Sequence, residues 1–366
     1  MGKPMQVIKR VLWSSFPAVL IVAILQIYSQ HKLNIANGFN RRISDSTLNM
    51  AISAKLASGH YYIAGLSADE IYLGNQDTSG LIRSFSYNLD RSWSRVLDVP
   101  PAIRFAWGAA RIYYLRKKFI LAEGITPLIF SFGLTGKATR TNTPNWKQFD
   151  LVVPSDSLFV CRTLDTFHHK NAITSQQVNT SENSSVDILK QQPGGIFSTD
   201  GMLLHDSTVG RFLYVYYYRN DLVSFDAGFE HVRTGFTIDT NTIAKIEISK
   251  IKSEHKRTFS SPPKSVNKFA CVSDGRLFVY SGLRADNEKG KLSYMACPID
   301  VYSVQSFKYL YSFYIPDYDH SGLHDMAIWK DKLVVLKGSH ISVYSMGSNS
   351  IKESNIALSA RVKTLQ

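Results

Sequence analysis

The sequence contains few of the residues that mark a disulfide-bonded or metal-bound scaffold. It has only three cysteines, Cys161, Cys271 and Cys297. None belongs to a CxxC pair or has a histidine at zinc-ligand spacing, so a zinc site is not expected. Each lies in an apolar, strand-like run, which predicts buried thiols. Cys271 and Cys297 fall within one predicted sheet and would be able to pair in an oxidising compartment.

Signatures of the best-marked enzyme classes are also absent. There is no glycine-rich phosphate loop, HExxH, GxSxG or protein-kinase motif, which argues against those mechanisms and no others. Long helical periodicity is missing after residue 60. Aromatic residues make up 12% of the chain, with 19 Tyr and 20 Phe, as in sheets whose pleated faces are covered by rings. The composition therefore indicates β-structure without an assignable catalytic group.

Acidic residues are scarce relative to basic ones. The 42 lysines and arginines outnumber the 29 aspartates and glutamates, which gives a net charge of +13. Five basic and no acidic residues lie in 101–122, and ten basic against four acidic residues lie in 250–291. An anionic partner fits this excess, and so do positive strand edges that discourage aggregation.

One uncharged run stands near the N-terminus. Residues 11–30 read VLWSSFPAVLIVAILQIYSQ, and as a helix they would span about 30 Å, the thickness of a bilayer core. Lys3, Lys9 and Arg10 precede the run, so the positive-inside rule predicts that residues 1–10 are cytoplasmic. A cleavable signal peptide is the alternative, but the run ends without an A-x-A pattern. We predict an uncleaved signal-anchor and a single-pass membrane protein whose bulk is extracytoplasmic (periplasmic), which disfavours nucleic acid as a partner.

A short phrase, a turn followed by three to five apolar or aromatic residues, recurs six times in the remaining chain. The copies are SADEIYLGN, WGAARIYYLR, PSDSLFVCR, VGRFLYVYYYRN, SDGRLFVYS and WKDKLVVLK, with first core residues Ile71, Ile112, Leu158, Leu213, Leu277 and Leu333. Another apolar run precedes each copy across the turn: YYIAGL, AIRFAW, FDLVV, GMLL, KFACV and DMAIW. Each copy is therefore interpreted as half of a hairpin, to which third and fourth strands are often added.

Three or four antiparallel strands per unit of roughly 40 to 60 residues are typical of propeller blades. We predict an all-β fold, a six-bladed β-propeller over residues 45–358, with a linker at 31–44 and a C-terminal tail at 359–366. Another blade number and a Greek-key sandwich are the alternatives. A sandwich would not explain the repeated hairpin.

Three segments depart from the repeat. The last hairpin, KLVVLK with HISVYSM, lacks a fourth strand, and the early segment Thr47–Leu56 is expected to supply it. Residues 164–195 and 252–265 are polar and rich in serine, the latter also in proline. They are predicted insertions, where binding usually occurs on a rigid scaffold.

The phrases HYYIAGLSADEIYLGN, GIFSTDGMLL with FLYVYYYRN, TIDTNT and NEKGKLSYMACPIDVYS resemble the six-bladed propellers of the TolB-like and NHL-like group, in particular its uncharacterised membrane-tethered bacterial members. The resemblance spans roughly residues 45–350. It implies a propeller that scaffolds protein contacts, binds a ligand or, less often, acts as a lactonase. The fold alone does not settle which.

Two clusters of polar side chains are candidate sites. Tyr216–Asn220 ends a predicted strand, where Tyr218 and Arg219 would form a ligand floor; alternatively the tyrosines pack between blades and Arg219 pairs with Asp221. The segment PDYDHSGLHDM would offer metal ligands or form a polar loop between blades, and its candidates are Asp317, Asp319, His320, His324 and Asp325.

The predicted function is non-enzymatic: a membrane-anchored extracytoplasmic scaffold, without a cofactor, that binds a protein or an anionic envelope component such as a glycan or lipid. Its candidate ligand-binding residues are Tyr218, Arg219, Lys256, Arg257, Arg284, Asn287, Lys289 and Lys291. The alternative is a metal-assisted, calcium-dependent lactonase-like hydrolase. The candidates for converging on calcium in the channel are Asp200, Asp239, Asn267, Asp286, Asn287 and Glu288.

Overall fold

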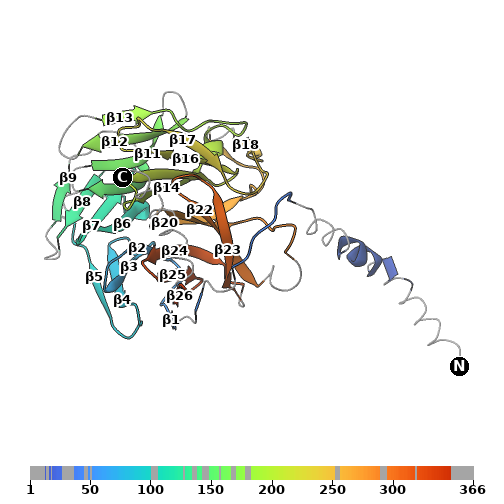
Figure 1. Ribbon diagram of the computed structural model, residues 1–366, viewed down its shortest axis with the longest axis horizontal. Coiled ribbons are helices and arrows are strands. Elements are labelled where there is room, and N and C mark those ends of the chain that lie inside the picture. Colours follow the sequence, from blue (N-terminus) through green and yellow to red (C-terminus); the bar gives the residue numbers. More distant parts are fainter. Residues whose placement is uncertain are drawn as a thin grey trace, which may run out of the picture.

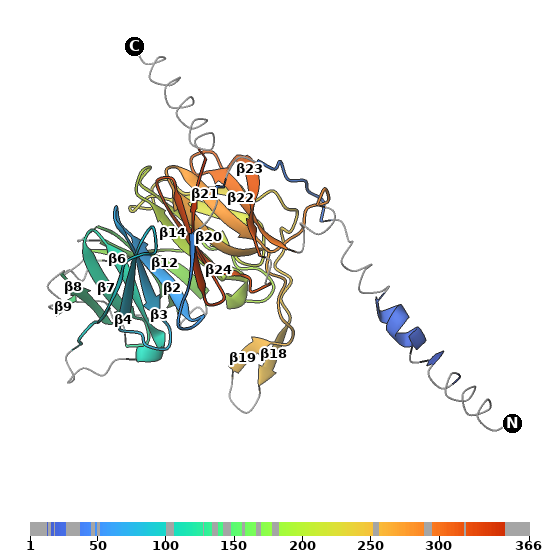
Figure 2. The same ribbon diagram turned by 90° about the horizontal axis from the view of Figure 1, so that it is seen from below.

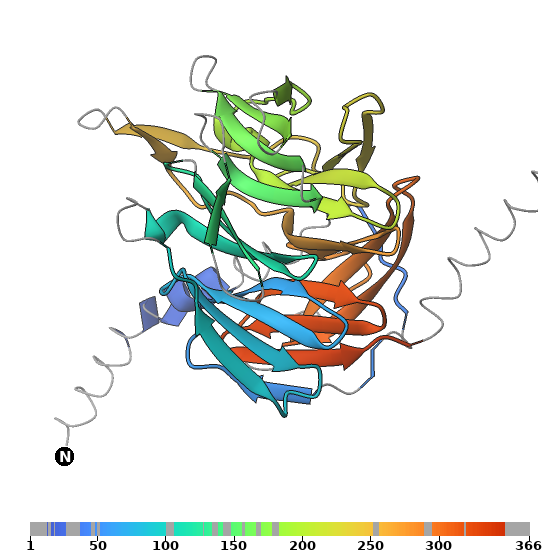
Figure 3. The same cartoon turned by 90° about the vertical axis from the view of Figure 1, so that its left-hand side faces the viewer.

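Six antiparallel sheets of four strands and one separate two-stranded hairpin make up the computed structural model. It describes residues 13, 16–17, 19–26, 37–44, 48–49, 52–99, 106–126, 128–133, 138–141, 148–155, 158–165, 170–177, 183–251, 256–288, 295–317 and 320–347. The sheets are arranged around a common axis (Figures 1 and 3). This confirms the prediction of an all-β six-bladed propeller.

Each blade is a meander of four strands paired in order from the inside outward. Blade 1 consists of β2 (Tyr61–Leu66), β3 (Glu70–Asn75), β4 (Leu81–Ser86) and β5 (Ser92–Val96). Blade 2 consists of β6 (Ala110–Leu115), β7 (Lys118–Glu123), β8 (Leu128–Phe132) and β9 (Ala138–Thr141). Blade 3 consists of β10 (Gln148–Ser155), β11 (Leu158–Asp165), β12 (Lys170–Gln177) and β13 (Asn183–Val186). Blade 4 consists of β14 (Gly201–Asp206), β15 (Arg211–Tyr216), β16 (Asp221–Phe225) and β17 (Arg233–Phe236). Blade 5 consists of β20 (Asn267–Ser273), β21 (Arg276–Ser281), β22 (Ala296–Ser303) and β23 (Tyr309–Pro316). Neighbouring first strands lie against one another, as β20 does against β14.

Blade 6 closes the ring with a strand from the N-terminal side of the propeller. It consists of β24 (Leu323–Trp329), β25 (Lys332–Lys337), β26 (His340–Ser345) and β1 (Ile52–Lys55). The register runs from Ile52 opposite Val343 to Lys55 opposite His340. The expectation that Thr47–Leu56 supplies the missing fourth strand is therefore confirmed for residues 52–55.

Blade 2 corrects one assignment in the repeat. The phrase WGAARIYYLR was interpreted as a second strand, but it forms a 3-10 turn at Trp107–Ala109 followed by the first strand, β6. The second strand, β7, follows a tight turn at Arg116 and Lys117, whose φ angles are 48° and 64°. Glycine or asparagine usually marks such left-handed turns. Because Arg116 and Lys117 form this turn instead, sequence analysis does not predict it.

Blade 3 corrects the predicted insertion at 164–195, because β12 and β13 lie inside it. Strand β12 is buried although it reads KNAITSQQ. Two of its buried polar side chains have partners inside the fold: Asn171 Nδ2 donates to Thr199 Oγ1 at 2.9 Å, and the Thr174 hydroxyl lies 2.9 Å from that of Thr163 on β11. The other predicted insertion does lie outside the blades. It contains β19 (Lys256–Phe259), the second strand of a hairpin whose first strand, β18 (Ile248–Ile251), comes just before it. The hairpin projects from the propeller in Figure 2.

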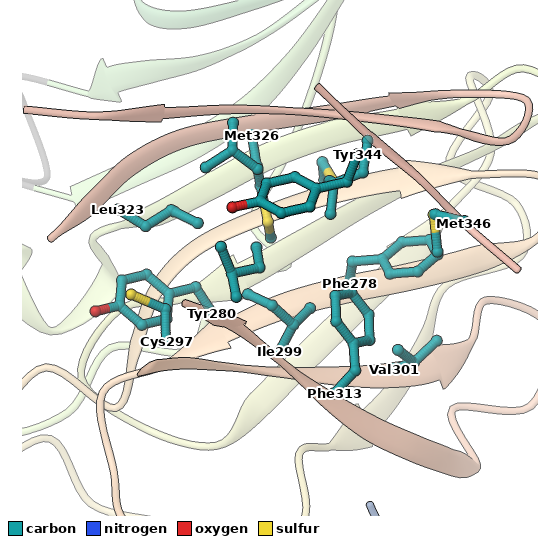
Figure 4. Packing of buried hydrophobic residues seen from close by; sticks show 14 of the residues in the cluster. Phe278, Tyr280, Cys297, Ile299, Val301, Phe313, Leu323, Met326, Tyr344 and Met346 are labelled. Atoms are coloured by element: carbon teal, nitrogen blue, oxygen red, sulfur yellow. The ribbon is translucent and has the colours of Figure 1, made fainter. Parts of the chain in front are cut away.

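The largest buried apolar cluster lies between blades 5 and 6 and is shown in Figure 4. Phe278 and Phe313 of blade 5 meet Met326 and Tyr344 of blade 6 within it. Cys271 and Cys297 belong to the same cluster, yet all three cysteines are free and buried. The suggested disulfide is therefore absent. Strand β21 separates β20 from β22, and Cys271 is level with Val301 rather than with Cys297. The two cysteines are therefore more than two strand spacings, or about 9.6 Å, apart, beyond disulfide reach.

The contact between blades 1 and 2 shows why one glycine stands inside a strand. The Tyr62 hydroxyl accepts a hydrogen bond of 2.7 Å from the backbone N–H of Ile112 in the next blade. Gly74 pairs with Tyr62 across β2 and β3, and a Cβ atom there would lie 2.2 Å from the Tyr62 ring. The absence of a side chain at Gly74 thus leaves the ring room to reach blade 2.

Near the N-terminus, residues 13, 16–17 and 19–26 are helical, and their side chains are exposed. Within the part of the chain that the structure describes, no helix is long and apolar enough to cross a membrane.

Candidate functional site

One face of the propeller carries both the connections between blades and the loops between second and third strands. Alternating strand directions in each meander place these segments together. In blade 5 they are residues 282–295 and 317–322. We call this the crossover face. The β18–β19 hairpin belongs to the connection between β17 and β20, so it leaves the propeller from the same face.

A cleft of about 380 Å³ lies on the crossover face of blade 5. Its size falls within the range of roughly 300 to 1,000 Å³ that is common for small-molecule sites. The cleft is formed by the ends of all four strands of the blade and by both crossover-face segments. The lining residues that matter for the argument below are Lys268, Tyr280, Arg284, Glu288, Tyr314 and Asp317.

Two tyrosines and one lysine form one part of the cleft. Lys268 is exposed, and its Nζ donates to the Tyr280 hydroxyl at 3.3 Å while lying 4.9 Å from the ring centroid. Burial raises the pKa of Tyr280, and burial together with the Glu288 carboxylate raises the pKa of Tyr314. Both phenols therefore stay protonated. The Tyr314 proton is donated to Glu288 and the Tyr280 proton to Cys297, so the phenol oxygens face a ligand as acceptors.

Asp317 provides a carboxylate to the cleft. Its Oδ2 accepts from the Gly322 N–H at 3.2 Å, whereas the buried Oδ1 has no hydrogen-bond partner among the described residues. The Lys337 ammonium lies 3.7 Å from Oδ1, too far for a hydrogen bond but close enough to favour the carboxylate. A buried acceptor without a donor is uncommon in native structures. Because Oδ1 is closed off from solvent in this structure, a ligand would reach it only after a shift of the surrounding side chains.

Glu288 links the cleft to a segment far away in the sequence. Its Oε1 accepts from the Tyr314 hydroxyl at 2.5 Å and from Arg41 Nη1 at 2.8 Å. Its backbone oxygen accepts from Arg284 Nε at 2.8 Å. Arg284 is therefore a wall of the cleft that its own loop holds in place.

Arg41 belongs to residues 37–44, which we call the strap. Its side chain is fully buried, and Nε also donates to Asp300 Oδ1 at 2.7 Å. Although burial works against the charged form, Asp300 and Glu288 together raise the pKa of Arg41 above its ordinary value. A parallel bridge between Ile43 and Ser312 attaches the strap to β23. Most of the segment expected as a free linker at 31–44 is thus docked on blade 5.

The only thiol in the cleft is poorly suited to nucleophilic catalysis. Burial raises the pKa of Cys297, and the hydrogen bond from Tyr280 offsets this only in part. A thiol is a weak nucleophile until it loses its proton. Cys297 is therefore not activated as a nucleophile in this cleft.

In the Tyr216–Asn220 cluster, Arg219 pairs with Asp221, as the alternative to a ligand floor predicted. Its side chain is fully buried, its Nε lies 2.7 Å from Asp221 Oδ2, and its guanidinium covers the Tyr216 ring at 3.7 Å. It also donates to the backbone oxygens of Ser198 and Lys190. Tyr218 is half-buried, with its ring 6.1 Å from that of Phe259 in the hairpin. Arg219 is therefore occupied in holding the chain together.

The basic candidates are not gathered into one site among the described residues. Asn287 holds the strap, because its Nδ2 donates to Arg41 O at 2.8 Å and its Oδ1 accepts from Arg41 N. Lys256 and Arg257 lie on β19, and their side chains are outside the description. Lys289 and Lys291 lie outside the described residues. Of the four candidates whose side chains the structure describes, Tyr218, Arg219, Arg284 and Asn287, the cleft contains Arg284 alone.

The acidic candidates for a metal site are also dispersed. In the described part of the chain no three His, Cys, Asp or Glu residues are grouped as metal ligands; Asp319 lies outside it. His324 approaches the Tyr61 oxygen, and Asp325 is buried against the Ile63 N–H. The calcium candidates each have protein partners: Asp200 pairs with Arg162, Asp239 binds Thr237 and Asn241, Asn267 binds Tyr216 and Arg219, Asp286 binds Asn37 and Gly38, and Glu288 pairs with Arg41.

Sequence analysis missed Lys268, Tyr280, Tyr314 and Arg41. The first three lie on three different strands and become neighbours only when the blade forms. One signal was available for Asp317, which follows a strand in the segment already noted for its polar density. An arginine in a presumed linker gives no comparable signal.

No family model matches the sequence, and none of the curated proteins matches it. Solved structures are similar in shape. Virginiamycin B lyase from Staphylococcus aureus has a TM-score of 0.47 and 9% identity, over 81% of this chain and 99% of that one. A DUF4221 family member from Bacteroides vulgatus has a TM-score of 0.47 and 11% identity, over 83% of this chain and 99% of that one. A streptogramin B lyase has a TM-score of 0.49 and 10% identity, over 83% of this chain and 100% of that one. Similarity of this degree supports no statement about function, and the fold assignment rests on the six sheets.

Proposed function

We propose that the protein is a membrane-anchored, extracytoplasmic β-propeller that binds an anionic, polyhydroxylated ligand, such as an acidic saccharide, in the cleft of blade 5. The observation that carries the ligand class is the composition of the cleft. An exposed ammonium at Lys268, the phenols of Tyr280 and Tyr314 and the residue Asp317 line one cavity. The ammonium suits a carboxylate or phosphate, and the other groups suit hydroxyls.

The anchor rests on the uncharged run at residues 11–30 and the basic residues before it. In support, the described helical residues of this run leave large apolar side chains exposed, among them Trp13 at 79%, Phe16 at 63% and Val19 at 65%. Exposed apolar surface on this scale marks an interaction with membrane or protein. We also place the chain with the membrane-tethered bacterial propellers of the TolB-like and NHL-like group.

Binding is favoured over hydrolysis because the candidate groups for the hydrolase are engaged elsewhere. Glu288, Asp286 and Asn287 hold the strap, and Asp200 pairs with Arg162. No described carboxylate in the cleft is paired with a second one, as general acid–base chemistry would often require.

The anchor is tested by fractionation. The full chain should sediment with membranes and resist extraction by salt, whereas a fragment beginning at Asn37 should be soluble. Starting the fragment at Ile43 would remove Arg41 and confound the result. Recovery of a mature protein whose N-terminus lies near residue 30 would contradict the anchor.

The ligand class is tested by calorimetry with a short uronic-acid oligosaccharide and its neutral counterpart. The acidic form should bind more tightly. Lys268→Ala and Asp317→Ala should each weaken binding at least about tenfold, because each removes a hydrogen bond to a charged or buried group. Lys308→Ala, an exposed lysine on the opposite face, is the control. Equal affinity for both oligosaccharides would refute the ligand class.

A further inference from the structure

One wall of the blade 5 cleft depends on a side chain from outside the blade. The loop after β21 contributes Leu283, Arg284 and Glu288 to the lining of the cleft. Arg41 of the strap binds this loop near both of its ends. Its Nη2 donates to the Leu283 oxygen at 3.1 Å, and its Nη1 donates to Glu288 Oε1 at 2.8 Å. A single buried guanidinium therefore fixes the span of the loop.

Glu288 passes this constraint on to two other residues that line the cleft. Its Oε1, which accepts from Arg41, also accepts from the Tyr314 hydroxyl at 2.5 Å. Its Oε2 accepts from the Ala285 N–H at 2.7 Å, and its backbone oxygen accepts from Arg284 Nε at 2.8 Å. Because hydrogen bonds to charged groups are the strong ones, the positions of Arg284 and Tyr314 depend on Glu288, and that of Glu288 depends on Arg41.

The backbone of the strap is attached to blade 5 as well. Asn37 Nδ2 donates to the Arg284 oxygen at 2.8 Å. Farther along, the strap runs beside β23 (Figures 1 and 2), where the Ser312 N–H donates to the Arg42 oxygen at 2.8 Å. The strap and the wall formed by Leu283, Arg284, Glu288 and Tyr314, which we call the strap-side wall, are therefore one hydrogen-bonded unit.

The other side of the cleft is positioned differently. Lys268 and Tyr280 belong to β20 and β21, and the backbone pairing of these two strands holds them. Their places in the cleft are thus set by blade 5 itself. If the strap were released, the strap-side wall would lose its order, whereas Lys268 and Tyr280 would stay where they are.

We propose that Arg41 is a positioning residue for the blade 5 cleft, so that docking of the strap and binding of the ligand are coupled. The inference rests on the proposed function of the cleft and adds a control of that same site. Coupling between two equilibria is reciprocal, so a bound ligand also favours the docked strap. The segment that joins the N-terminal run to the propeller would accordingly set the affinity of the cleft.

Calorimetry of the full chain in detergent, with the short uronic-acid oligosaccharide as the probe, measures the coupling. Arg41→Met should weaken binding about fivefold, the effect of losing about one hydrogen bond. Arg41→Lys, which keeps the charge without the guanidinium fork, should recover part of the loss and is the variant to use if Arg41→Met does not fold. Arg42→Met changes the neighbouring exposed arginine and is the control, expected to bind as the natural sequence does.

A double-mutant cycle separates positioning from a general loss of stability. In a Tyr314→Phe background, Arg41→Met should weaken binding only about twofold, because one contact that Arg41 positions is already gone. In a Lys268→Ala background the factor should remain about fivefold, because Lys268 lies on the other side of the cleft. Equal factors in the two backgrounds would overturn the route through Glu288.

Hydrogen exchange followed by mass spectrometry tests the reciprocal effect. The Ser44 N–H donates to the Ser312 oxygen at 2.9 Å, and exchange over residues 38–44 should slow up to about fivefold when the oligosaccharide saturates the cleft. Unchanged exchange at saturation, or an Arg41→Met affinity equal to that of the natural sequence, would overturn the coupling and leave the proposed function standing. Absence of binding by the natural sequence would refute the proposed function, and this inference with it.

Discussion

The strap and strand β1 both attach the N-terminal segment to the propeller, but they do so by different means. The strap depends on one fully buried side chain, that of Arg41, between two carboxylates. Strand β1 is held by backbone pairing to β26, and three of its four residues are exposed. The strap therefore concentrates its stabilisation in a charge, whereas β1 distributes it along a ladder and completes the ring. Substitutions that separate charge from backbone test this difference.

The largest effect is expected from removing β1 while keeping the chain length. Replacing residues 52–56 with alternating glycine and serine should expose the edge of β26 and remove the buried Leu56. The loss of free energy of unfolding should approach the whole net stability of a domain, about 5 to 15 kcal/mol. Thermal unfolding followed by circular dichroism measures it. A melting temperature equal to that of the natural sequence would contradict closure by this strand.

Removing the Arg41 charge comes next. Arg41→Met leaves Glu288 and Asp300 buried without their cation, which should cost about 3 to 5 kcal/mol. Urea unfolding of the fragment beginning at Asn37 measures the change. Arg42→Met is the matched control, because Arg42 is exposed and its guanidinium donates to the Leu310 oxygen, and it should cost no more than about 1 kcal/mol. Adding Asp300→Asn to Arg41→Met should restore part of the loss; equal losses at positions 41 and 42 would show that the strap is not held by charge.

The smallest and most specific effect on stability is expected at Asp325, whose carboxylate is buried without an ion pair as close as those of Arg41. It is 4% exposed, and burial raises the pKa of its carboxyl to about 6, although Arg111 and the Ile63 N–H lower it in part. The folded state binds the proton more tightly than the unfolded state, whose aspartate pKa is about 3.9. The contribution of Asp325 to stability should therefore be full below pH 4 and be lost as the pH rises through 6.

Comparing the natural sequence with Asp325→Asn isolates this titration. The stability difference should change by about 2 kcal/mol between pH 4 and pH 7, in favour of the variant at the higher pH. Denaturant unfolding at a series of pH values provides the data. A difference that stays constant across this range would mean that Asp325 ionises normally.

Sequence analysis predicted strands correctly where a run of apolar residues lies next to a turn. The hairpins around Leu213, Leu277 and Leu333 are examples, and so is the need for a closing strand. It failed where polar side chains are buried against one another, as in β12, since an internal hydrogen bond leaves no trace in hydropathy. It also failed at the turn of Arg116 and Lys117, where residues other than glycine adopt positive φ.

The candidate site was less accessible to sequence analysis than the fold. Arg284 and Asp317 were singled out, but Lys268, Tyr280 and Tyr314 were not, although all five line one cleft. Tyrosines in strands usually pack within sheets, and only the blade geometry turns these two toward a cavity. Arg219 shows the reverse case, because a conspicuous charge beside aromatic rings proved to be fully buried.

The pairing of β1 with β26 has a consequence for biosynthesis. Ser53 bonds to Ile341 across 288 residues of sequence. At about 5 to 20 residues per second, the first strand made has no partner until the last blade is complete, roughly 15 to 60 s later. Its sequence, ISAK, is short and ends in a lysine, which suits this wait, because a longer apolar edge would attract other chains. The ring is therefore sealed by the strand that has been exposed longest.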